Sequence, residues 1–117
     1  MTTVEILKAT RQLFADTHWI KGAFRYTDFS KTYYCDVGGL RHCAGLNENK
    51  PALSEDTTAY REAVETLAVA TGVHIRLGGT PSHEDAIVRF NDDPGTTLED
   101  NLRAFDLAIE RAEKEET

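Results

Sequence analysis

The chain has 117 residues, of which 40% are hydrophobic, and a formal net charge of -7 from 13 Lys and Arg against 20 Asp and Glu. This length and hydrophobic content fit one ordinary domain with its own core and argue against wholesale disorder. The acidic balance opposes direct binding of DNA or RNA, where cationic side chains must neutralise phosphates. An acidic domain can instead contact a basic protein surface, although most such domains are simply soluble.

No stretch of the sequence is long and apolar enough to cross a membrane. The longest apolar runs, such as residues 67–70, fall far short of the ~20 residues that a span requires. The N-terminus carries Glu5 and lacks the basic-then-apolar pattern of a signal peptide. Two cysteines are too few for a disulfide framework and are typical of free thiols in a reducing compartment. We therefore expect a cytoplasmic protein without membrane contact.

The first third of the chain predicts a helix followed by a hairpin. Thr2 and Glu5 form a capping-box pair, and the apolar residues after them recur at a period near 3.6, which predicts a helix that fades between Asp16 and His18. Residues 24–35 are rich in aromatic side chains that favour extended chain, and the turn-like TDFSK lies in the middle of them. We expect a small hairpin or structured loop here, ended by the Gly-Gly pair at residues 38–39.

The remainder of the chain predicts three further helices and a short one. The short helix is expected over residues 40–46, before the polar loop NENKPALSED with capping residues over 54–58. Residues 60–71 have the clearest helical periodicity and end at Gly72, a typical C-terminal cap. VHIRLGG predicts a short strand or an extended segment. Capping pairs at Ser82 with Asp85 and at Thr97 with Asp100 predict helices over 83–91 and after 97, with a strand as the alternative for AIVRF.

Together these elements predict a fold that is mainly α with a small β-hairpin (α+β). We expect one compact helical bundle as a single domain over residues 1–117, with a frayed tail at about residues 113–117. An isolated hairpin is marginally stable in water, so it should lie against the helices.

Cys43 is the one candidate nucleophile. At the start of a short helix, its thiol would have a lowered pKa because a helix N-terminus favours an anion. His74 or His42 would then be the base, with Asp92 to orient it, and the protein would be a cysteine-dependent hydrolase. This is the alternative interpretation. The favoured one is a buried apolar thiol on the inner face of the helix.

A metal site would have to combine cysteines and histidines that lack the usual spacing. The candidates are Cys35, His42 and Cys43 with one of His18, His74 or His83. Structural zinc sites use two ligand pairs two to four residues apart, and the sequence has neither C-x-x-C nor H-x-x-x-H. We expect no metal and no cofactor.

Two stretches are candidates for binding. FNDDPGTTLED contains Asn91 and Asp92 at a helix end, either as a polar site or, as we favour, as a stabilised corner between two helices. Trp19 is expected to cover the core. The aromatic residues of the hairpin region would form a binding patch where they are exposed: Tyr26, Phe29, Tyr33 and Tyr34.

The order of these motifs resembles a small family of unknown function from actinobacteria and their phages. Members have W-x-x-G-A near residue 20, a C-A-x-G-A-L-like helix in the middle and an N-D-x-P-G-x-T corner near the end. The match is carried by Trp19, Gly22, Ala23, Cys43, Ala44, Asn91, Asp92, Pro94, Gly95, Thr97 and Asp100. This chain departs from the pattern with Phe90 in place of an indole. The resemblance implies an origin, and no activity.

We therefore expect a small soluble accessory protein, phage-encoded, that acts through protein–protein interaction with a host or phage protein. Self-association is left open. The motivation is the negative charge, the lack of a convincing catalytic constellation and the aromatic insert between the first two helices.

Overall fold

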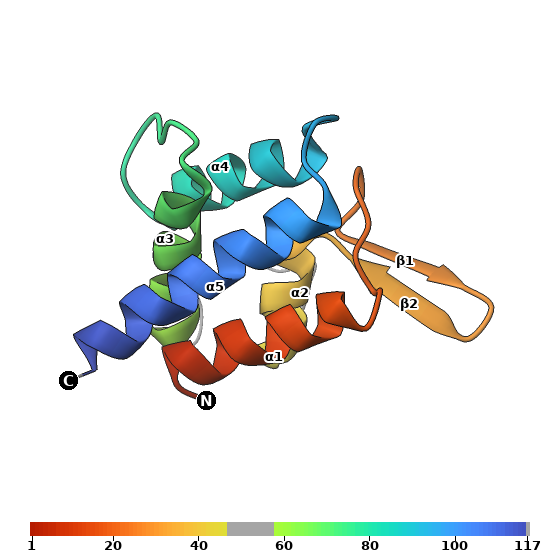
Figure 1. Cartoon of the computed structure of the whole chain (residues 1–117), viewed down its shortest axis with the longest axis horizontal. Coiled ribbons are helices and arrows are strands. Elements are labelled where there is room, and N and C mark those ends of the chain that lie inside the picture. The colour runs from red at the N-terminus through yellow and green to blue at the C-terminus, as the bar shows by residue number, and fades with distance from the viewer. Residues whose placement is uncertain (47–57, 117) are drawn as a thin grey trace.

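The computed structural model describes residues 1–46 and 58–116 and is shown in Figure 1. In this part of the chain, five helices surround one core, and a two-stranded antiparallel hairpin projects from one end of the helical body. The elements are α1 (Thr3–Ala15), β1 (Arg25–Asp28), β2 (Lys31–Tyr34), α2 (Asp36–Cys43), α3 (Thr58–Thr71), α4 (Thr80–Asp92) and α5 (Leu98–Glu115). The expected fold class, mainly α with a small hairpin, is confirmed.

The helix ends follow the expected capping chemistry in most places. Thr2 and Glu5 form both hydrogen bonds of a capping box before α1, and Thr97 and Asp100 do the same before α5. After α3, Gly72 has φ +74°, a left-handed conformation that glycine adopts without strain. The helix predicted over 83–91 is confirmed, and the strand alternative is wrong.

The helix α4 begins earlier than the capping pair predicted. Gly79 is its N-cap, and Pro81 lies in the first turn, where a missing N–H costs nothing. The hydroxyl of Ser82 accepts a hydrogen bond from the Leu77 backbone N–H (3.0 Å), so it braces the preceding segment and is not the cap. VHIRLGG contains no strand. The predicted polar loop at 47–56 and most of the capping stretch at 54–58 lie outside the described residues.

The core lies where α1, α3 and α5 meet, with the short α2 packed inside against α1, α3 and α4. The rings of Phe14 and Phe105 meet edge to face with centroids 5.6 Å apart, a favoured aromatic geometry. The largest fully buried apolar side chains are Tyr60, Phe14, Phe105, Leu7, Leu40, Leu67 and Ile87. No helix in the described ranges is long and apolar enough to span a membrane.

The prediction that the glycine pair ends the hairpin is wrong. Gly38 and Gly39 lie inside α2. A Cβ on Gly38 would lie 2.1 Å from the Phe24 carbonyl oxygen, and one on Gly39 would lie 2.7 Å from Cζ of Phe14. Both distances are too short for any other side chain. The pair therefore lets α2 approach the chain before β1 and the ring in α1, a tertiary requirement that overrides the low helix propensity of glycine.

Candidate functional site

The first and last motifs of the sequence meet at one corner of the molecule. The indole N–H of Trp19 donates to Oδ1 of Asn91 at 2.6 Å, and the Asn91 amide donates to the carbonyl oxygen of Ile20 at 3.1 Å. The same Oδ1 accepts the backbone N–H of Asp36 at 3.0 Å. Asn91 is fully buried, so it ties α4 to the start of α2 and to the chain before the hairpin. Asn91 thus has a long-range structural role, which differs from the local corner between α4 and α5 that the sequence predicts.

Asp92 lies on the exposed side of this corner. Its Oδ1 accepts the backbone N–H of Gly22 and one amide hydrogen of Asn91, both at 2.9 Å. The carboxylate is therefore held by one backbone N–H, from the chain before the hairpin, and by the side-chain amide of its neighbour Asn91. Lys21 donates to the carbonyl oxygen of Asp93 at 2.5 Å and lies 5.5 Å over the Trp19 ring.

Asp36 is a buried acid that the sequence did not single out. It is completely shielded from solvent, and neither carboxyl oxygen has a hydrogen-bond partner of good geometry within the described chain. Burial raises the pKa of Asp36 to about 8, against the opposing effect of the nearby Asn101 amide and Trp19 indole, while the charge of Asp92 adds to the rise. Asn101 is also fully buried, and neither polar atom of its side chain has a hydrogen-bond partner among residues 1–46 and 58–116. Asp36 is therefore protonated over most of the physiological range.

Neither cysteine lies in an environment that favours a thiolate. Cys43 is the last residue of α2, so the N-terminus of this helix cannot lower the pKa of its thiol. The prediction that Cys43 lies at the start of a helix is wrong. Burial instead raises the pKa of Cys43. Cys35 is the N-cap of α2, where its sulfur accepts the N–H of Gly38 at 3.4 Å, and burial raises its pKa to about 11. Both cysteines are free.

The two histidines that the sequence offers as bases, His42 and His74, make their contacts with residues other than Cys43. The His42 ring stacks on Tyr34 with centroids 4.7 Å apart, and its Nδ1 lies 3.3 Å from the tyrosine hydroxyl. His74 is exposed, and its backbone carbonyl accepts a hydrogen bond from Arg89. Asp92 bonds to Gly22 and Asn91, whereas the side chain that interacts with the Cys43 thiol is Thr10 of α1. Within residues 1–46 and 58–116, no group of three metal-ligating side chains is close enough to hold an ion.

The four aromatic residues of the hairpin divide into two kinds. Phe29, between β1 and β2, is 99% exposed, and Tyr26 in β1 is 50% exposed. Tyr33 is half-buried and pairs across the strands with Tyr26, with ring centroids 6.4 Å apart. Tyr34 is buried at the base of β2, where a bridge to Trp19 joins it to the helical body. The exposed patch is therefore smaller than the sequence indicated.

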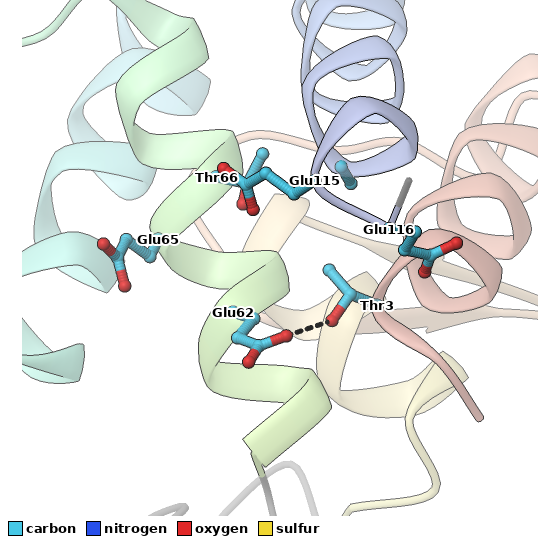
Figure 2. A pocket seen from close by; sticks show the side chains of 7 residues that line it. Thr3, Glu62, Glu65, Thr66, Glu115 and Glu116 are labelled. Atoms are coloured by element: carbon cyan, nitrogen blue, oxygen red, sulfur yellow. Dashed lines mark hydrogen bonds between the residues drawn. The ribbon is translucent and has the colours of Figure 1, made fainter.

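Two of the pockets in the described part of the chain have acidic but no basic residues in their walls. One, of about 290 Å³, lies between α3 and the C-terminal end of α5, beside the start of α1, and is lined by Thr3, Glu62, Glu65, Thr66, Ala112, Glu115 and Glu116. Figure 2 shows its acidic side chains and the hydrogen bond from Thr3 to Glu62. The second, of about 180 Å³, lies at the base of the hairpin beside Asp92. We call them the glutamate pocket and the hairpin pocket.

Burial differs between the two ends of α2. Cys35, Gly38 and Leu40, at and just after its start, are buried. Cys43 and Ala44 come at its end and are only partly buried.

Comparison with known proteins places the chain in one family. The model of a family of unknown function, DUF6197, matches residues 1–111. No curated protein and no solved structure shows significant similarity to the chain. The chain belongs to this family, which covers all of the described elements except the last residues of α5.

Proposed function

We propose that this member of the family is a small accessory protein that binds another protein through the tip of its hairpin. The observation that carries the proposal is Phe29, which is 99% exposed at the end of a ribbon that extends from the helical body (Figure 1). Phe24 and Tyr26, on the same ribbon or next to it, are about half exposed. Aromatic surface in water has a free-energy cost that burial against a partner removes.

The backbone of Phe29 supports a use for its ring. Phe29 has φ +54°, in the left-handed region where a bulky residue is strained and glycine is not. A turn selected for stability alone favours Gly or Asn at such a position. A phenylalanine here is unfavourable for both solvation and backbone conformation. We infer that the ring has a role in binding, which offsets these costs.

The proposed partner is a protein with a groove for the ring and a basic surface around it. Exposed aromatic side chains are the usual anchors of protein interfaces. The net charge of -7 favours a basic partner and opposes direct contact with DNA or RNA. A host or phage protein in the cytoplasm fits the resemblance to proteins of actinobacteria and their phages, and the two free cysteines suit a reducing compartment.

Photo-cross-linking from the hairpin tip tests the proposal. A photoreactive phenylalanine analogue replaces Phe29 in one variant and Leu77 in a matched control, since Leu77 is also exposed (75%) but lies outside the hairpin. Both variants are irradiated in cells that naturally contain the protein. We expect one discrete adduct from position 29, which wild-type protein competes away and a Phe29→Ser variant does not. The adduct should re-form from purified components.

Three results would oppose the proposal. The first is the same set of adducts from positions 29 and 77, which would indicate non-specific contact. The second is no adduct from position 29. The third is an adduct of twice the mass of the chain, which would replace the heterologous partner with a second copy of this protein.

A further inference from the structure

The hairpin pocket lies where the hairpin joins the helical body. Its walls are Gly22, Ala23, Phe24, Cys35, Val88 and Asp92. Three of these side chains are apolar, the thiol is nine-tenths buried or more, and one wall residue has a charge. The pocket thus combines a small, mostly apolar wall, which includes the half-exposed ring of Phe24, with a single carboxylate.

The carboxylate of Asp92 is held in place but not neutralised. Its Oδ1 accepts hydrogen bonds from Gly22 and Asn91, and Asp92 has no ion-pair partner among residues 1–46 and 58–116. Lys21 is close in sequence, but its ammonium group is bound to the Asp93 carbonyl oxygen and is not part of the pocket wall. A preorganised anion without a cation is suited to receive one from outside.

We propose that the hairpin pocket binds the ammonium or guanidinium group of a Lys or Arg side chain of the partner protein. The proposal rests on the function proposed above. The apolar walls would cover the methylene stem, the Phe24 ring would lie against the cation, and Asp92 would pair with its charge. The pocket lies at the base of the ribbon whose tip carries Phe29, so one basic partner can contact both.

The size of the pocket favours a side chain over a free metabolite. Its volume of about 180 Å³ lies below the ~300 Å³ at which small-molecule sites usually begin, but it suffices for one long side chain. The glutamate pocket in Figure 2 is the natural comparison. It has more carboxylates, yet Ala112 is its one apolar wall residue, and no ring lines it. Its walls therefore offer little apolar surface to cover the methylene stem of a Lys or Arg side chain, a contact that the hairpin pocket adds to its carboxylate.

A titration with side-chain analogues tests the pocket without knowledge of the partner. The probes are N-acetyl-lysine methylamide, N-acetyl-arginine methylamide and, as an uncharged control, N-acetyl-norleucine methylamide. Chemical shifts of the ¹⁵N-labelled full chain report the binding site. We expect saturable shifts at Gly22, Ala23 and Val88 with the two cationic probes. With norleucine, binding should be at least about tenfold weaker.

Two variants separate charge from folding. Asp92→Asn keeps an oxygen for the Gly22 N–H and should weaken binding of the cationic probes about tenfold. Phe24→Ala removes a half-exposed ring of the pocket wall and should weaken binding of the cationic probes several-fold, which gives a second test that does not depend on Asp92. Equal binding of norleucine, unchanged affinity in both variants, or shifts at Glu62 and Glu65 instead would overturn the proposal.

The titration also keeps this inference distinct from the proposed function. Phe29→Ser removes the ring at the tip of the hairpin and leaves the pocket intact. It should therefore leave the affinity for the cationic probes unchanged, while the variant protein should no longer compete with the cross-link. A cross-link from position 29 without any binding of the cationic probes would leave the accessory function intact and refute the pocket. Binding of the cationic probes without a cross-link from position 29 would support the pocket and refute the proposed role of the hairpin tip.

Discussion

The buried carboxyl of Asp36 makes a specific prediction about stability and pH. Its pKa is about 8 in the folded protein because burial disfavours the anion, and 3.8 is its ordinary value. Between these two values the unfolded chain releases the proton while the folded chain keeps it, so the free energy of unfolding falls as pH rises. The contribution of the protonated group is fully present below about pH 4 and is lost progressively up to about pH 8.

The magnitude follows from the width of this window. Each pH unit corresponds to about 1.4 kcal/mol, so the whole window corresponds to a loss on the order of 5 kcal/mol. An Asp36→Asn variant cannot ionise at this position and keeps the shape of the side chain. Compared with wild type, the variant should therefore gain stability steadily from pH 5 to pH 8, by roughly 1 kcal/mol or more per pH unit.

Urea unfolding at pH 5, 6, 7 and 8, followed by circular dichroism, measures this difference. The comparison of variant with wild type cancels every pH-dependent contribution that the two chains share. Asp28→Asn, at an exposed acid of the hairpin, is the matched control and should change the pH profile little. Parallel profiles for wild type and Asp36→Asn would refute the reasoning, because they would mean that Asp36 is ionised or solvated in the folded protein.

Three further predictions concern the corner and α2. Gly38→Ala should destabilise the protein by about 2 kcal/mol or more, since its Cβ would overlap the Phe24 carbonyl oxygen; a change within 0.5 kcal/mol in urea unfolding would contradict the close approach. Asn91→Ala should cost about 2–4 kcal/mol in the same assay because it leaves an indole and a backbone N–H unpartnered, and near-neutral stability would exclude the network. At pH 7, native Cys35, with its pKa of about 11, should react with iodoacetamide at least ~100-fold more slowly than in the unfolded chain, and Cys43 should also be slowed; fast alkylation of Cys43 would revive the hydrolase alternative.

The sequence predicted the local features of the fold well, because their causes are local. The capping boxes at Thr2 and Thr97 need residues only three positions apart. The helix over 58–71 follows from its own apolar period, and the hairpin follows from aromatic residues that flank a turn. Each of these predictions depended on neighbours within a few residues.

The features that the sequence did not reveal depend on contacts between distant segments. Gly38 has its reason in the Phe24 carbonyl, which comes against it only after the chain has folded back. An acid in the first turn of a helix normally faces solvent, so Asp36 gave no signal that α5 and its Asn101 would bury it. Trp19 and Asn91 are 72 residues apart, and nothing in either motif predicts that they share a hydrogen bond.

The same limit explains the site predictions. Phe29 and Tyr26 are exposed, whereas Tyr34 is buried. Tyr33 and Tyr34 are adjacent on one strand and face opposite ways, so the sequence could not show which of the two rings would be buried. The hairpin pocket combines residues 22–24 with Cys35, the N-cap of α2, and two residues of α4, so it has no sequence signature. The placement of Cys43 depended on where α2 begins, and an error of four residues reversed the expected direction of its pKa.

The affinity of the cross-linked partner for hairpin variants tests the central claim most directly. Isothermal titration of the purified partner should show that Phe29→Ser weakens binding by at least about tenfold, as expected for an aromatic anchor. Leu77→Ser, which removes a comparably exposed apolar side chain outside the hairpin, should leave the affinity within about twofold of wild type. Equal affinities for wild type and Phe29→Ser, with both proteins folded, would contradict the claim that the hairpin tip is the binding element.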